Sequence, residues 1–142
     1  MPVLIARLLA LVLLTLPLQA LAEGWALGGM DAVAYRSEGR AVPGRGDVVT
    51  RWAGQDWHFV SEENRAAFEG NPREYAPGLR GLCPVELAES GRAVPGDPHL
   101  FAIIGQRLYL LSSPSAREVF LADPRSILMR AKEAFVALGE SE

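Results

Sequence analysis

The sequence predicts a small α+β domain built of two tandem β-hairpin-helix units and a long C-terminal helix. The hexapeptide Gly-Arg-Ala-Val-Pro-Gly occurs at residues 39–44 and again, letter for letter, at residues 91–96. Matches continue after each copy at an offset of 52 residues, which falls to 51 over the predicted hairpins, as one loop deletion would produce. A unit of this length does not bury its apolar face alone. We therefore expect the two repeats, about 37–76 and 89–131, to pack as one domain.

Residues 1–22 have the composition of a secretory leader. Arg7 supplies positive charge, an apolar run covers Leu8 to Leu18, and Ala-Leu-Ala at residues 20–22 places small residues where a signal peptidase cleaves. The uncharged stretch after Arg7 is about 15 residues, whereas a membrane-spanning helix needs about 20. We expect cleavage before Glu23, export to the periplasm or secretion, and no membrane attachment afterwards; a retained anchor is the alternative.

The mature chain would contain the 120 residues 23–142, which suits one domain. Loss of the leader removes Arg7, one of 14 basic residues, and leaves all 17 acidic residues, so the formal charge goes from −3 to −4. Nucleic-acid binding requires clustered Lys and Arg, which this chain lacks. Sparse basic residues near the three tryptophans (Trp25, Trp52 and Trp57) likewise favour core packing over a stacking surface.

The first unit is predicted to be a hairpin followed by a helix. β-branched and aromatic residues at 47–53 and 56–60 flank a turn at Gly54-Gln55. Ser61 offers an N-cap hydroxyl, and two glutamates follow it where the helix dipole favours anions. Gly70 ends this helix, and a short helical turn is expected at residues 73–75.

The second unit repeats this order and ends in a longer helix. Strands are expected at Phe101–Ile104 and Arg107–Leu111, and Ser113 caps a helix that has Pro114 at its first position. Asp123-Pro124 then starts the long helix, which Gly139 closes. Apolar residues recur in it at near-helical spacing: Ile127, Leu128, Ala131, Ala134, Phe135 and Leu138.

Two segments lie outside the recognised repeat, Trp25–Arg36 and Ala76–Ser90, and we expect localised function there. In the first, Asp31 is a natural N-cap for a short helix at residues 32–35. In the second, Pro84 predicts a helix start with Cys83 at or beside its N-cap.

Three ordered motifs resemble the exported branch of the YHS-domain family. They are Leu-Gly-Gly-Met-Asp-Ala-Val-Ala-Tyr at 27–35, Trp-His-Phe-Val-Ser-Glu-Glu-Asn-Arg at 57–65, and Asn-Pro-Arg-Glu-Tyr-Ala-Pro at 71–77 with Gly-Leu-Cys at 81–83. The resemblance covers nearly the whole mature chain. It implies a small metal-binding domain, with copper as the metal, because related domains are attached to copper-transporting ATPases and some oxygenases. The chain departs from the family pattern at Met30, Ala32, Arg36 and Pro84.

Cys83, the only cysteine, cannot form an internal disulfide or a two-thiolate site within one chain. A thiol at a helix N-cap faces free N–H groups, which favour the thiolate. Such a thiolate could ligate copper or zinc, with His58 and Met30 as partners, or attack a disulfide. The alternatives are a buried, inert cysteine and a structural histidine, since His58 aligns with Tyr109 at the offset of 51.

Asp31 and Tyr35 are candidate ligand-orienting residues that would line a pocket with Cys83. The sequence contains no nucleophile elbow, no His-Glu-x-x-His and no Cys-x-x-Cys, which favours a non-catalytic protein. Three functions therefore stay open: a copper- or zinc-binding module, a metal-free ligand- or protein-binding (scaffolding) module, and a thiol-based redox protein. The sequence does not predict an oligomeric state.

Overall fold

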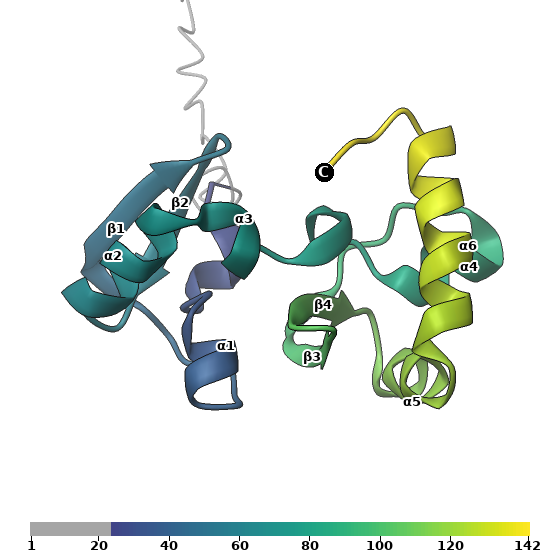
Figure 1. The fold of residues 1–142 in the computed structure, drawn as a ribbon, viewed down its shortest axis with the longest axis horizontal. Helices are drawn as coiled ribbons and strands as arrows, with labels where there is room; N and C mark the ends of the chain where they lie inside the picture. Colours follow the sequence, from purple (N-terminus) through teal and green to yellow (C-terminus); the bar gives the residue numbers. More distant parts are fainter. Residues whose placement is uncertain (1–23) are drawn as a thin grey trace, which may run out of the picture.

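The computed structural model describes residues 24–142; the expected leader and its cleavage site lie outside this range. The first half of the chain forms η2 (Ala26–Gly29), α1 (Ala34–Ser37), β1 (Arg45–Trp52), β2 (Gln55–Phe59), α2 (Glu62–Gly70) and α3 (Pro72–Tyr75). The second half forms η3 (Gly78–Gly81), α4 (Pro84–Ser90), β3 (Asp97–Ile104), β4 (Arg107–Leu111), α5 (Pro114–Ala122) and α6 (Pro124–Ala137). Each half thus contains a 3-10 helix, a helix, an antiparallel hairpin and two helices, and the predicted α+β class is confirmed (Figure 1).

The two halves correspond at a constant offset of 52 residues, so the predicted slip to 51 is wrong. The hairpin turns consist of Ala53-Gly54 and Gly105-Gln106, all four with positive φ. The first turn therefore lies one residue earlier than the expected Gly54-Gln55. Both hairpins also have a register shift near the start of their first strand, between Arg45 and Val49 and at the corresponding place in β3. It follows that His58 corresponds to Leu110, and Trp57 to Tyr109.

The repeat also includes the two segments expected to be single-copy. Leu27 in η2 and Leu79 in η3 have φ of 55° and 56°, and each accepts a hydrogen bond of 3.0 Å from the main-chain N–H three residues later. Asp31 and Cys83 consequently occupy the same position in the two units. This part of the repeat is hard to detect in the sequence because the two segments share backbone geometry but few side chains.

The repeated hexapeptide ties each 3-10 segment to its hairpin. The carbonyl of its valine accepts the N–H of Asp31 in the first unit and of Cys83 in the second, both at 2.8 Å. The N–H of its last glycine donates back to the 3-10 helix at 2.9 Å in the first unit and 2.8 Å in the second. A Cβ on either last glycine, Gly44 or Gly96, would overlap the backbone of the hairpin's second strand. The hexapeptide is therefore a packing element.

The helix starts follow the expected capping pattern. Ser61 accepts a hydrogen bond from Asn64 N–H at 3.1 Å at the start of α2, and Ser113 makes the same bond, at 3.0 Å, at the start of α5. Helix α4 begins at Pro84 with Cys83 at its N-cap, as predicted. Helix α1 starts at Ala34, two residues later than expected. None of the helices in residues 24–142 is long and apolar enough to cross a membrane.

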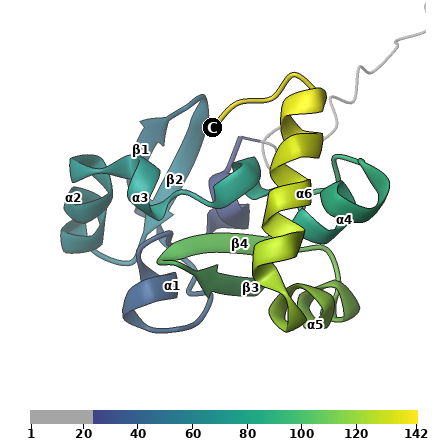
Figure 2. The same ribbon diagram turned by 45° about the vertical axis from the view of Figure 1, so that its right-hand side comes forward.

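The second hairpin lies between two apolar cores. Alternate residues of β3 and β4 contribute to the first core, which the first unit supplies: Phe101, Ile103, Leu108 and Leu110. The intervening residues contribute to the second core, under α4, α5 and α6: Ala102, Tyr109 and Leu111. Figure 2 shows this hairpin between the first unit and the three helices. Because both of its faces are buried, the two units form one packed structure.

Two side chains of α1 reach across to the second unit. Tyr35 donates its hydroxyl proton to the Pro98 carbonyl at 2.7 Å. Burial, with a contribution from the Asp97 carboxylate, raises the pKa of Tyr35 well above its ordinary value, so this hydroxyl keeps its proton. Arg36 donates to the carbonyl of Gln106 and pairs with Glu74 at 2.7 Å. These contacts hold the first unit against the second hairpin.

Replacing Gly96 by alanine is expected to lower the free energy of unfolding by about 2–3 kcal/mol, because the added Cβ overlaps the buried backbone of Leu110. Gly46→Ala is the control, since a Cβ at Gly46 meets no atom within 4 Å. Urea unfolding followed by circular dichroism measures both. Equal stability of the two variants would contradict the packing role of the hexapeptide.

Candidate functional site

Cys83 lies at the predicted helix start, yet its thiol is not accessible. The residue is 0% exposed and belongs to the second apolar core, with Leu79, Val85 and Leu87. Its side chain makes no capping hydrogen bond to α4. These surroundings are typical of a cysteine that serves as a small apolar residue.

Asp31, at the corresponding position of the first unit, is also fully buried but is saturated with hydrogen bonds. Its Oδ1 accepts the N–H groups of Val33 and Ala34, at 2.8 and 3.2 Å. Its Oδ2 accepts the Val60 N–H and the Asn64 side-chain amide, both at 2.8 Å. The carboxylate therefore joins α1, the end of β2 and α2. The N-cap of α1 is Val33, so the predicted N-cap position of Asp31 is wrong; its four hydrogen bonds nevertheless indicate a structural role and leave no free acceptor directed at a ligand.

The remaining predicted site residues have separate surroundings. His58 is buried against Trp25, with ring centroids 4.5 Å apart, and its Nδ1 lies 3.3 Å from the Arg45 carbonyl oxygen. Met30 is partly buried against the first core, to which Tyr35 also belongs. Within residues 24–142, no group of three or more His, Cys, Asp and Glu side chains is arranged to hold a metal ion.

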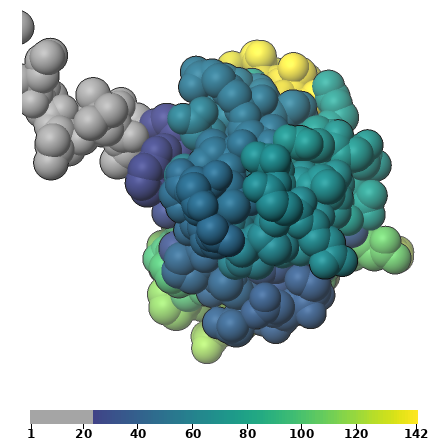
Figure 3. Space-filling model, turned by 90° about the vertical axis from the view of Figure 1, so that its left-hand side faces the viewer, coloured from purple at the N-terminus to yellow at the C-terminus, as the bar shows by residue number. Residues whose placement is uncertain are grey.

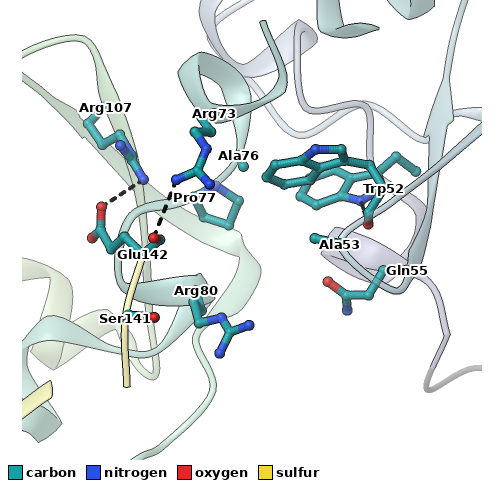
Figure 4. Close-up of a pocket in the computed structure, with 11 residues that line it drawn as sticks. Trp52, Ala53, Gln55, Arg73, Ala76, Pro77, Arg80, Arg107, Ser141 and Glu142 are labelled. Atoms are coloured by element: carbon teal, nitrogen blue, oxygen red, sulfur yellow. Dashed lines mark hydrogen bonds and ion pairs between the residues drawn. The ribbon is translucent and has the colours of Figure 1, made fainter. Parts of the chain in front are cut away.

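The structure instead contains a cavity of about 310 Å³ at the seam between the two units, which we call the seam cavity (Figure 4). The first hairpin supplies one wall, which we call the aromatic wall because it contains Trp52 and Trp57. The opposite wall, which we call the arginine wall, contains Arg73, Arg80 and Arg107, and residues 141–142 lie against it. The lining residues are Trp52, Ala53, Gln55, Trp57, Arg73, Ala76, Pro77, Arg80, Arg107, Ser141 and Glu142. None of the predicted site residues is among them.

The arginine wall already holds a carboxylate. Glu142 Oε2 lies 3.0 Å from Nη2 of Arg107, and its Oε1 accepts the main-chain N–H of Leu79 at 2.9 Å. Arg73 donates to the main-chain oxygen of Glu142 at 3.3 Å. Arg80 pairs with Glu140 at 2.8 Å. One carboxylate is thus held by a guanidinium and a backbone amide, which is a charge-assisted arrangement at a partly exposed position.

An uncharged phenol lies close to the charged groups of this wall. Burial raises the pKa of Tyr109, the charge of Arg107 opposes the shift, and the charge of Glu142 adds to it. The Nε–H of Arg107 is buried and makes no hydrogen bond with any of the residues that the structure describes. Arg107 therefore binds Glu142 through Nη2 and not through its buried Nε–H.

The aromatic wall is held in place by packing. Trp52 and Trp57 meet edge to face with ring centroids 5.6 Å apart, and the Trp57 indole donates to the Trp52 carbonyl at 2.9 Å. Phe68 of α2 packs against both indoles from within the first core. Trp57 and Phe68 are buried, whereas Trp52 is half-buried. The cavity thus combines a fixed apolar surface with a cationic one.

Sequence reasoning missed this site for two reasons. The three arginines lie at positions 73, 80 and 107, so no short motif contains them. The scarcity of basic residues near the tryptophans in the sequence predicts core packing, which is correct for Trp57 but not for the half-exposed Trp25. Arg80 and Arg107 lie opposite Trp52 only because of the way in which the two units pack, and this packing cannot be inferred from local sequence.

Comparison of the chain with models of known families, with curated proteins and with solved structures finds no match. The resemblance to the YHS-domain family therefore stays a prediction.

Replacing Asp31 by asparagine is expected to lower the free energy of unfolding by about 3 kcal/mol, because an amide NH₂ would face buried donors that now share a carboxylate. Asp123→Asn is the matched control: Asp123 caps α6 through Ser126 N–H at 3.2 Å but is exposed. We expect that change to cost less than about 1 kcal/mol. Urea unfolding tests both, and similar losses would refute the buried-network role.

Native Cys83 is expected to react with an aromatic disulfide reagent far more slowly than the urea-unfolded chain does, because the thiol is 0% exposed. Release of the coloured thiolate gives both rates. Equal rates in the native and unfolded protein would show that the thiol is accessible and would favour the metal and redox hypotheses.

Proposed function

We propose that this chain is a non-catalytic binding module that holds a carboxylate-bearing ligand in the seam cavity. One observation carries the proposal: the Glu142 carboxylate is held between Arg107 and the Leu79 N–H, opposite the aromatic wall. Of the functions left open by the sequence, this is the metal-free binding module, at a site different from the predicted one.

The charge and shape of the seam cavity favour an organic anion with a flat apolar part. Of its three arginines, Arg80 is paired with Glu140 and Arg107 with Glu142, whereas Arg73 contacts a main-chain oxygen and pairs with no acidic side chain of residues 24–142. Guanidinium groups bind carboxylates in a fixed planar geometry. The aromatic wall offers an apolar surface to the part of the ligand that carries the carboxylate. The volume of about 310 Å³ is at the small end of the range for ligand pockets.

The lining of the seam cavity supports binding more than catalysis. It contains no histidine, cysteine or aspartate, and its one carboxylate, Glu142, is engaged by Arg107 and Leu79. General acid–base or nucleophilic catalysis needs such a group free to reach the substrate.

The copper or zinc hypothesis for Cys83, with His58 and Met30, stays a prediction that none of these observations tests. The burial of Cys83 in an apolar core does not favour it. Titration of the mature protein and of Cys83→Ser with Cu(I) tests the hypothesis directly.

Export of the module, inferred from the leader, is tested by the N-terminal sequence of the exported protein, for which we expect Glu23 as the first residue.

Phenylacetate is a suitable probe for the seam cavity, because it joins one carboxylate to one flat ring. We expect it to shift the indole N–H signal of Trp52 in ¹H–¹⁵N NMR spectra, whereas phenylethylamine, its cationic counterpart, has no such effect. Arg107→Gln is expected to weaken phenylacetate binding about tenfold, through loss of the charged partner.

Arg92→Gln is the matched control, because Arg92 pairs with Glu86 at 3.0 Å, the distance of the Arg107–Glu142 pair, but does not line the seam cavity. Its affinity for phenylacetate should equal that of the unaltered protein. The proposal is overturned if phenylacetate shifts no Trp52 signal either in the unaltered protein or in Glu142→Gln, in which Arg107 has lost its charged partner.

A further inference from the structure

The residues that follow α6 turn back into the seam cavity. After the helix ends at Ala137, Gly139 has a φ of 80° and donates to Val136 at 2.9 Å, and Glu140 donates to Phe135 at 3.2 Å. This reversal directs residues 140–142, the acidic segment, away from the helix and toward the first hairpin (Figure 2). Figure 3, which faces the first unit, shows yellow residues from the C-terminal part at the upper edge of this face.

The acidic segment contacts the arginine wall through two carboxylates that are two residues apart. Glu140 pairs with Arg80 at 2.8 Å, and Glu142 pairs with Arg107 at 3.0 Å. Ser141, between them, lines the seam cavity. A Glu-x-Glu peptide therefore fits this wall without rearrangement of the arginines.

We infer that the acidic segment is a resident competitor for the seam cavity, and that the external ligand is an acidic peptide with two carboxylates two residues apart. This inference rests on the proposed function. The acidic segment shows which chemistry the wall accepts, and its position shows that an external ligand must displace it.

The contacts of the acidic segment are suited to displacement. The side chains of the Arg107–Glu142 pair are 31% and 38% exposed, and those of the Arg80–Glu140 pair are 62% and 38% exposed. Ion pairs this exposed contribute about 0–1 kcal/mol each. The attachment of the segment to α6 also keeps its local concentration high, in the millimolar range for a short tether, which favours the segment over a weak external ligand.

The acidic segment also leaves the aromatic wall available. Two residues of the acidic segment line the seam cavity, Ser141 and Glu142, and neither has a large apolar group that could cover Trp52. An acidic peptide that also carries an aromatic residue would contact both walls at once. Such a ligand makes contacts with the aromatic wall that the acidic segment cannot make. The ligand can therefore displace the acidic segment.

The test compares the unaltered protein with the double variant Glu140→Gln and Glu142→Gln, which keeps the chain length and removes both charges. The probe is the end-blocked peptide Phe-Gly-Glu-Ser-Glu, titrated by calorimetry and by the Trp52 indole signal. We expect about tenfold tighter binding to the double variant, because the resident carboxylates no longer compete. The same peptide with glutamine for both glutamates should bind neither protein.

Two controls separate competition from damage to the fold. Glu86→Gln removes the carboxylate of the exposed Arg92 pair, outside the seam cavity, and should bind the peptide as the unaltered protein does. In Glu142→Gln, faster hydrogen exchange of the Leu79 amide, with other protected amides unchanged, would support release of the acidic segment.

The possible failures are distinguishable. Equal peptide affinity of the unaltered protein and the double variant would overturn the competitor role. Binding of phenylacetate but not of the peptide would overturn the ligand class and leave the proposed function intact. Failure of phenylacetate with both the unaltered protein and Glu142→Gln would overturn the proposed function itself, and this inference, which rests on it.

Discussion

The structure depends on the burial of both faces of the second hairpin. A two-stranded hairpin is marginal by itself in water. Here the residues of β3 and β4 that face one way complete the core of the first unit, and the residues that face the other way complete the core under α4–α6. This requirement explains the apolar run Leu108–Leu111, where the corresponding strand of the first unit, β2, includes Asp56 and His58. Neither core is complete without this hairpin, so duplication of the unit produced one domain.

Local chemistry made much of the fold predictable, and tertiary geometry limited the rest. Serine caps and first-position prolines mark helix starts wherever they occur, and Ser61, Ser113 and Pro84 were correctly identified. The hairpin turns were misaligned because the identical pair Gly-Gln in both copies suggested a match. The backbone instead places Ala53-Gly54 opposite Gly105-Gln106, since these two pairs have the positive φ at both positions that defines a type I′ turn. Turn geometry, and not residue identity, determines the correspondence.

The pair Asp31 and Cys83 shows why the predicted site could not be assessed from sequence. Both donate their N–H to the valine of the hexapeptide at 2.8 Å and precede a helix, so the two positions have the same backbone role. Their side chains meet opposite surroundings: four hydrogen-bond donors around the carboxylate, and apolar groups around the thiol. Position on the helix was predictable from local sequence. Accessibility was not, because it depends on residues from other elements.

The seam cavity arises where the two units differ. Trp52 corresponds to Ile104 and Gln55 to Arg107, so the indole occurs only in the first copy and the guanidinium only in the second. Arg80 corresponds to Gly28, which offers no side chain. The third difference is helix length, since α3 stops at Tyr75 and leads into η3, whereas α6 continues to Ala137 before the chain returns to the seam. If the two units were identical, the cavity would have neither an arginine wall facing an aromatic wall nor an acidic segment to occupy it. Binding chemistry in this protein therefore comes from the divergence of the repeat, while the shared hexapeptide and caps maintain the scaffold.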